Sequence, residues 1–141
     1  MNINFKPLII INMFQYQVPF GEAVKRALNK YCCFSGRASR SEYWWWILFS
    51  FIVNTALNYI FLFISSAETA VMVCGIVGLA LLLPSLGLCV RRLHDIGKSG
   101  WWWLLALIPI VGAIILIVWF CKDSQPTENQ YGPIPNLVER R

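Results

Sequence analysis

Three long apolar stretches separate the polar parts of this chain. Residues 43–64 carry no charged side chain over 22 positions, and a helix of that length extends about 33 Å, enough to cross a bilayer. Two further uncharged runs cover residues 69–90 and residues 101–121. The pattern predicts three transmembrane helices at these positions, joined by short connections.

A shorter amphipathic segment, residues 20–34, precedes the first apolar run. At 100° per residue, one arc of a helix would collect Glu22, Lys25, Arg26, Asn29 and Lys30. The opposite arc would collect Phe20, Ala23, Val24, Ala27, Leu28 and Tyr31. A basic face opposite an aromatic and aliphatic face predicts a helix that lies in the membrane interface. A helix packed against other protein is the alternative.

The predicted spans also carry local signals at their ends and in their interiors. Ser39 and Glu42 have the spacing of a capping box, in which a serine starts the helix and a glutamate lies at its third position. Pro84 predicts a kink near the end of the second span. Pro109 and Gly112 predict another kink within the third span.

Polar side chains recur within the first span. Ser50, Asn54 and Asn58 are spaced four residues apart, which places them on one face of a helix. Amide side chains are costly in lipid, so we expect this face to point toward other helices and to form hydrogen bonds there. A polar lining for a small solute is the alternative.

Polar segments flank this membrane domain, residues 20–121. Residues 1–19 are expected to form a poorly ordered extension, within which Met13 is an alternative translation start. Residues 122–141 contain three prolines and are expected to form a mostly irregular polar tail. The expected fold is an all-α integral membrane protein, with an amphipathic interfacial helix followed by three transmembrane helices.

Composition and charge agree with a membrane protein. Only 13% of the residues are charged, against about a quarter in soluble domains. Residues 1–42 hold six Lys and Arg, residues 91–100 three, the tail three and the turn 65–68 none. With three spans and a cytoplasmic N-terminus, nine basic residues fall inside and three outside, which predicts an N-in, C-out orientation. Basic clusters beside spans favour anionic lipid as a partner rather than nucleic acid.

Residues 91–103 form one strongly polar island between two apolar runs, and they include the only histidine, His94. Basic residues mark the cytoplasmic side of a span, and tryptophans mark the headgroup layer. We interpret the island as a cytoplasmic hairpin loop. Two tryptophan triplets are expected to anchor the first and third spans at one membrane depth, namely Trp44, Trp45, Trp46, Trp101, Trp102 and Trp103.

No catalytic, metal or cofactor site follows from these residues. His94 and Asp95 are adjacent, but neighbouring side chains on a helix diverge, and no obvious nucleophile accompanies them. A metal site needs about three protein ligands, whereas the chain has one histidine and five cysteines without a CxxC pair. The segment Gly97-Lys98-Ser99 lacks the earlier glycine of a phosphate-binding loop, because position 92 is arginine.

Two sequence boxes resemble those of a known family. The first runs from Phe34 to Trp44 and reads FSGRASRSEYW, and the second runs from Arg91 to Trp102 and reads RRLHDIGKSGWW. Both resemble the signatures of the family called domain of unknown function 805, and the tail residues Asn129, Tyr131, Gly132 and Pro133 also fit. The resemblance covers about residues 20–135. It implies a small multi-pass protein of the bacterial inner membrane and no assigned activity or cofactor.

We expect the two boxes to meet on the cytoplasmic face through ionic contacts. The expected polar network consists of Arg37, Arg40, Glu42, Arg91, Arg92, His94, Asp95 and Lys98. The first hypothesis is a non-enzymatic protein that binds anionic lipid headgroups or a membrane partner, including a second copy of itself, through this network. The second is a membrane-embedded enzyme that uses His94 and Asp95 on a lipid-like substrate. The third is a subunit of a small-solute transporter.

Overall fold

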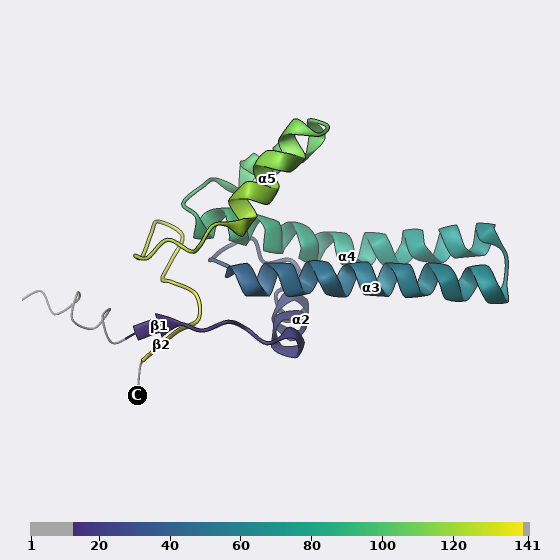
Figure 1. The fold of residues 1–141 in the computed structure, drawn as a ribbon, viewed down its shortest axis with the longest axis horizontal. Coiled ribbons are helices and arrows are strands. Elements are labelled where there is room, and N and C mark those ends of the chain that lie inside the picture. Colours follow the sequence, from purple (N-terminus) through teal and green to yellow (C-terminus); the bar gives the residue numbers. More distant parts are fainter. Residues whose placement is uncertain (1–12, 140–141) are drawn as a thin grey trace, which may run out of the picture.

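Two long antiparallel helices form the body of the molecule (Figure 1). In the computed structural model, which describes residues 13–139, these helices are α3 (Arg40–Ile64) and α4 (Ala67–Asp95). Both are long and apolar enough to cross a membrane. Most of the expected N-terminal extension, residues 1–12, lies outside the described part of the chain.

Serine side chains start both long helices. Ser39 Oγ accepts the backbone N–H of Glu42 at 3.4 Å, and Ser66 Oγ accepts that of Thr69 at 3.3 Å. Each bond satisfies an N–H group that has no acceptor within the helix. The predicted capping serine at position 39 is confirmed. The Glu42 carboxylate, however, contacts Arg91 instead of completing a capping box.

Helix α4 continues beyond the predicted end of the second span, so its last turn carries part of the polar island. The helix ends at Asp95, and two residues later Gly97 has a φ of 77°, a left-handed conformation that glycine adopts without strain. The N–H groups of Gly97 and Lys98 donate to the carbonyls of His94 and Leu93 at 3.0 and 2.9 Å, as in a Schellman motif. Residues 91–95, which we expected in a loop, are therefore helical.

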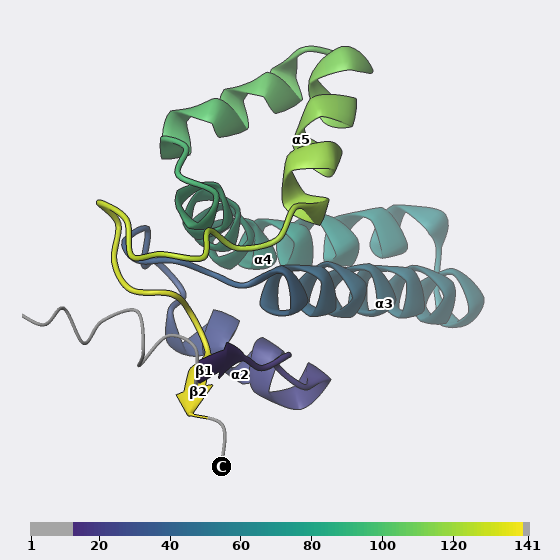
Figure 2. The same ribbon diagram turned by 60° about the vertical axis from the view of Figure 1, so that its left-hand side comes forward.

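The third apolar segment is not one continuous helix, which corrects the span predicted over residues 101–121. It consists of a 3₁₀ helix, η1 (Gly100–Leu107), and an α-helix, α5 (Val111–Cys121). The two fold back on each other as a hairpin, here called the arm (Figure 2). Each leg is about 16 Å long. Neither leg alone spans a hydrocarbon core, which is about 30 Å thick.

The backbone at the tip of the arm explains the reversal. Ile110 has a φ of 66°, and the N–H of Val111 donates to the carbonyl of Pro109 at 2.8 Å, which is a γ-turn centred on Ile110. A Cβ placed on Gly112 would lie 1.7 Å from the Leu105 carbonyl oxygen. Pro109 and Gly112, from which the sequence predicts a kink, thus lie where the chain reverses its direction.

The C-terminal tail returns to the end of the molecule where α2 lies. The N–H of Gln125 donates to the Asp95 carbonyl at 3.2 Å, and strand β2 (Leu137–Glu139) pairs antiparallel with β1 (Met13–Gln15). Both strands lie at the same end as α2 in Figure 1. The tail and the N-terminal segment thus lie side by side, whereas the expected N-in, C-out orientation put them on opposite sides of the membrane. The paired strands also add a short ribbon to a fold that we expected to be entirely helical.

Helix α2 (Phe20–Asn29) packs against protein on its apolar side. Ala23 and Ala27 are fully buried, and the Phe20 ring meets Trp45 edge to face with 5.7 Å between centroids. The helix is shorter than the segment predicted over residues 20–34. These contacts favour the alternative of a helix packed on protein, while an interfacial position for its basic side stays a prediction.

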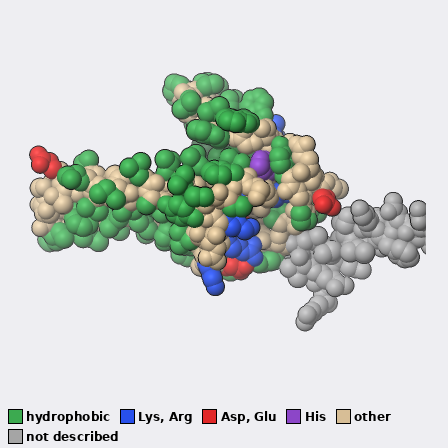
Figure 3. Space-filling model, turned by 180° about the vertical axis from the view of Figure 1, so that it is seen from behind, with side chains coloured by type: hydrophobic (Ala, Val, Ile, Leu, Met, Phe, Trp, Pro, Cys, Tyr) green, Lys and Arg blue, Asp and Glu red, His purple; other side chains and the backbone are tan. Residues whose placement is uncertain are grey.

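Apolar side chains remain exposed along α3, α4 and the arm (Figure 3). Phe63, Leu79 and Ile110 are 91%, 70% and 76% exposed. Buried side chains gather instead where the helices meet α2, around Trp46, and where they meet the arm, around Leu93. Apolar surface of this extent is typical of a protein in contact with lipid or with another protein.

The polar face predicted in the first span is only partly covered. Asn54 is half-buried. Its side-chain amide donates to the Ser50 backbone carbonyl at 3.0 Å, and its backbone carbonyl accepts the thiol of Cys74 from α4 at 3.8 Å. Asn58 is exposed in the described chain. The Asn54 amide thus bonds within its own helix, and the Asn54 backbone, not the side chain, accepts the bond from α4, so the expectation that these amides face another helix stays a prediction.

Candidate functional site

Buried ion pairs form where the two sequence boxes meet. Arg37 Nε lies 3.0 Å from Asp95 Oδ1, and Arg92 pairs with the other carboxylate oxygen. Ser124 from the tail donates to the same carboxylate at 2.6 Å. The three charged side chains are at most 1% exposed. We call Arg37, Arg92 and Asp95 the Asp95 cluster.

The arginines of the Asp95 cluster also hold the tail in place. Arg37 donates at 2.9 to 3.3 Å to the backbone carbonyls of Gln125, Thr127 and Gly132. Arg92 donates to the backbone carbonyls of Phe120 and Lys122. A planar guanidinium offers five N–H donors and can bind several acceptors at once. Because these donors already bind protein carbonyls, the two arginines are structural and are not free for a headgroup.

Glu42 and Arg91 make a separate buried pair. Arg91 Nη1 lies 3.3 Å from Glu42 Oε1, and both side chains are at most 3% exposed. The sequence predicts a single polar network, but the structure contains two separate buried ionic groups. Arg91 and Arg92 are consecutive on α4 and therefore point in different directions, so each meets a different acid.

Burial changes the pKa of the two acids, Glu42 and Asp95. Both lie outside the uncharged stretches 43–64 and 69–90. Loss of hydration raises the pKa of both carboxyl groups. The facing arginines oppose this rise, because they stabilise the charged form. A buried carboxylate without such a partner would be costly, so each acid depends on its arginine.

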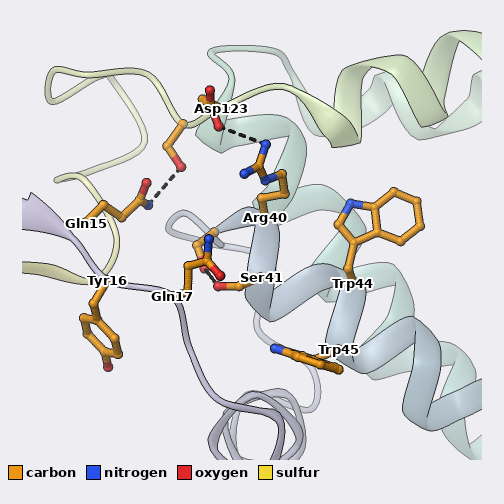
Figure 4. Close-up of a pocket in the computed structure, with 10 residues that line it drawn as sticks. Gln15, Tyr16, Gln17, Arg40, Ser41, Trp44, Trp45 and Asp123 are labelled. Atoms are coloured by element: carbon orange, nitrogen blue, oxygen red, sulfur yellow. Dashed lines mark hydrogen bonds and ion pairs between the residues drawn. The ribbon is translucent and has the colours of Figure 1, made fainter.

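A polar pocket of about 420 Å³ opens at the N-terminus of α3. Its walls come from the N-terminal segment, the first turns of α3 and the start of the tail, and they include Ser39, Arg40, Ser41, Trp44, Trp45 and Asp123. We call it the Arg40 pocket. Figure 4 shows Arg40 and Asp123 facing each other at one side of this pocket, with Trp44 and Trp45 further along α3.

Arg40 is a signature arginine that remains accessible. It pairs with Asp123 at 3.0 Å, but the two side chains are 46% and 88% exposed, and an ion pair in water is weak. Arg40 and Ser41 are the first residues of α3, where backbone N–H groups lack helical acceptors and favour an anion. The pocket therefore offers a guanidinium and a helix N-terminus to an anionic group.

His94 and Asp95 do not form a catalytic pair. His94 Nδ1 lies 3.1 Å from the Gly36 carbonyl oxygen, and its ring stacks on Tyr131 with 3.8 Å between centroids. The Asp95 carboxylate is occupied by the two arginines of its cluster. The hypothesis of an enzyme that uses both residues thus lacks the arrangement on which it depends.

The tryptophan triplets do not all serve as anchors. Between 37% and 76% of the surface is exposed in Trp44, Trp45, Trp101 and Trp102. Trp103 is half-buried. Trp46 is fully buried and donates to Ser85 Oγ at 2.9 Å, so it belongs to the core. Lys98 lies over a different indole, with its ammonium 4.2 Å from the centre of the Trp119 ring, and makes a cation–π contact there.

Sequence reasoning missed the part that the tail plays. Tail carbonyls bind Arg37 and Arg92, Asp123 pairs with Arg40, and the Asn129 amide donates to the His94 carbonyl at 2.9 Å. A signal was present, because the resemblance extends to Asn129 and to residues 131–133. A family pattern within a polar tail indicates contacts with the folded domain.

Comparisons with known proteins place these features in a family. A family model described as "Protein of unknown function (DUF805)" matches residues 31–133. The inner membrane protein YhaH of Escherichia coli (strain K12) is 40% identical over 114 residues, covering 79% of this chain and 94% of that protein. The inner membrane protein YhaI of the same organism is 40% identical over 110 residues, covering 78% and 92%. No solved structure matches the chain.

Proposed function

We propose, from the premise that this chain belongs to the DUF805 family of proteins of unknown function, that it is a multi-pass inner-membrane protein that binds phospholipid headgroups in the Arg40 pocket. One observation carries this proposal. A partly exposed guanidinium lies at a helix N-terminus and beside two tryptophans, which are residues suited to the headgroup layer.

In the proposed topology, α3 and α4 cross the bilayer, and the arm enters it from the cytoplasmic side without crossing. All twelve Lys and Arg lie outside residues 43–90 and 101–121. With a re-entrant arm they all fall on one side, which agrees better with the positive-inside rule than three spans do. The tip of the arm supports the same topology, because Leu107 and Ile110 are 73% and 76% exposed.

Reporter fusions test this topology. A fluorescent protein fused after Arg141 is expected to be fluorescent, and alkaline phosphatase at the same position inactive, because the tail would lie in the cytoplasm. Fusions placed in the α3–α4 turn, after Ser66, should give the reverse result. An active phosphatase at the C-terminus would contradict the re-entrant arm.

A phosphate in the Arg40 pocket would replace a weak contact by a stronger one. Arg40 pairs with Asp123 in a hydrated position, whereas a phosphate can accept two parallel N–H bonds from a guanidinium. The first N–H groups of α3 would add to its binding. Trp44 and Trp45 continue from the pocket into the uncharged stretch of α3, so the acyl chains would extend along the exposed apolar side of that helix.

Replacement of Arg40 by glutamine is expected to weaken phosphatidylglycerol binding about tenfold, because one bidentate charge-assisted contact is lost. The full chain would be placed in phosphatidylcholine nanodiscs that contain increasing phosphatidylglycerol. Native mass spectrometry of the released protein would then count the retained anionic lipid.

Two matched variants control this measurement. Lys98→Gln removes the same charge outside the pocket and should leave retention unchanged. Asp123→Asn removes the competing carboxylate and should increase retention. Equal losses from Arg40→Gln and Lys98→Gln would mean that lipid responds to total charge, and the Arg40 pocket would not be the site.

A further inference from the structure

A second pocket, here called the His94 pocket, lies between α4, the start of η1 and the tail. Its volume is about 420 Å³, and it shares no lining residue with the Arg40 pocket. The only histidine of the chain reaches the surface below the arm, where it is purple in Figure 3. The imidazole therefore stands at the edge of a hollow that the headgroup proposal does not use.

The hydrogen bond to Gly36 determines which ring nitrogen carries the proton. A carbonyl oxygen only accepts, so Nδ1, at 3.1 Å from it, must be the donor. His94 lies outside the uncharged stretch 69–90. Burial lowers its pKa, and an ordinary histidine is already mostly neutral at pH 7, so the ring is neutral. The neutral ring then has a bare Nε2, which is a hydrogen-bond acceptor. The stacked ring of Tyr131 holds the imidazole in this orientation.

Gly100 keeps the Nε2 side of the ring open. A Cβ on Gly100 would lie 3.4 Å from His94 Nε2 and 2.7 Å from a methyl group of Val90. Both Gly100 and His94 line the pocket. The absence of a side chain at position 100 therefore leaves room for a ligand atom beside the bare nitrogen.

The pocket continues from the imidazole along one face of α4. Leu86, Val90 and His94 all line it and are spaced four residues apart, so they form a row on the helix. That row leads from the polar end of α4 into its uncharged stretch. The indoles of Trp101 and Trp103 form part of the opposite wall. The pocket thus has one polar end and an apolar path toward the membrane.

The charge of the lining restricts the ligand. None of the described residues that line the pocket is charged, so a phosphate or carboxylate would find no counter-ion and would lose its hydration. A hydroxyl group needs only an acceptor for its proton, which Nε2 provides. Ser99, whose Oγ accepts the Trp101 N–H at 3.4 Å, retains its own O–H as a donor for the ligand oxygen.

We propose that the His94 pocket binds an uncharged lipid with a hydroxyl headgroup. Its O–H donates to His94 Nε2, and its apolar chain follows Val90 and Leu86 into the bilayer. Diacylglycerols and membrane quinols share this chemistry, and the test below separates them. This proposal is independent of the headgroup proposal, because the two pockets share no lining residue. The test below records only the His94 imidazole, which phosphatidylglycerol in the Arg40 pocket would not contact.

The single histidine provides a direct measurement. The full chain, labelled with ¹⁵N-histidine, gives one imidazole spin system in phosphatidylcholine nanodiscs. We expect dioctanoylglycerol, decylubiquinol or both to shift the Nε2 resonance in a saturable way, whereas the methyl ether of dioctanoylglycerol should not. A response to one probe alone identifies the source, and a response to both means that the site selects only the hydroxyl and the chain. No shift with either probe, or an equal shift with the ether, would overturn the proposal.

Variants separate the acceptor from the fold. His94→Asn keeps an amide donor for the Gly36 carbonyl but has no acceptor at the Nε2 position, so binding measured by tryptophan emission should weaken about tenfold at an unchanged melting temperature. In the double variant Gly100→Ala/Val90→Ala, the shorter side chain at position 90 makes room for the new methyl group at position 100, which then lies against His94 Nε2. The double variant should abolish the ligand-induced shift, while Val90→Ala alone retains it. Undiminished binding in both test variants would refute the site.

Discussion

Replacement of Asp95 by alanine is expected to lower the free energy of unfolding by about 3–5 kcal/mol, because it leaves buried charges uncompensated. Asp95 is the shared acid of Arg37 and Arg92, and all three side chains are at most 1% exposed. Ser124 would also lose its acceptor. The two guanidinium groups would then face each other without a counter-ion, and the tail that they hold would loosen with them.

A matched control exists in the same protein. Asp123→Ala also removes an aspartate paired with an arginine at 3.0 Å, but that pair is 46% and 88% exposed, and we expect a loss below about 1 kcal/mol. Reversible unfolding in mixed micelles of increasing SDS content would give both values. Similar losses from the two variants would contradict the buried position of the Asp95 cluster.

Replacement of Gly112 by alanine is expected to open the arm, at a cost of about 3 kcal/mol. The new Cβ would lie 1.7 Å from the Leu105 carbonyl oxygen and 3.1 Å from Ile108 Cβ. Rotation of a side chain cannot relieve a clash with a backbone carbonyl, so the two legs must separate. Gly78→Ala is the control, because nothing lies within 4 Å of a Cβ there and alanine favours a helix interior by about 0.5–1 kcal/mol.

The separation of the legs can be measured across the arm. Trp102 in η1 and Trp119 in α5 have ring centroids 5.7 Å apart. Cysteines at these two positions, in a background without the native cysteines, should be joined by a short bismaleimide in high yield. Gly112→Ala should reduce the yield and Gly78→Ala should not. An undiminished yield with Gly112→Ala would show that the close contact at Leu105 does not hold the arm closed.

The helical hairpin and its ionic end were predictable because their signals are local. An uncharged run of 22 residues is long enough for a span, and the serine before it, Ser39, caps the helix. Glu42 lies beside that run and needs a cation nearby. The arginines at the end of the next antiparallel run are the nearest in a hairpin, which is where the structure places Arg91.

The arm was not predictable from hydropathy. Residues 101–121 are as long and apolar as a span, and apolarity says nothing about chain direction. The reversal depends on the positive φ of Ile110 and on the approach of Gly112 to Leu105. Proline and glycine in the sequence indicated where the chain bends but not by how much.

The accessibility of the arginines also required the structure. Arg37, Arg40 and Arg92 all belong to basic boxes, yet Arg37 and Arg92 are buried under the tail while Arg40 is not. The groups that bind Arg37 and Arg92 are mostly backbone carbonyls. Every residue has a backbone carbonyl, so the sequence does not indicate which ones bind an arginine. The candidate headgroup site is therefore Arg40 with its pocket, and not the whole polar network expected from the sequence.

The arm also gives the molecule different widths at its two ends. Of the described helices, α3 and α4 alone extend to the far end, whereas α2 and the arm lie beside them at the near end (Figure 2). In the topology proposed above, each copy would displace more lipid from the cytoplasmic leaflet than from the opposite one. A membrane region with many copies of the protein would then bend, with its convex side toward the cytoplasm, because its two leaflets would have unequal areas. Crowding of the protein and membrane curvature would thereby favour each other.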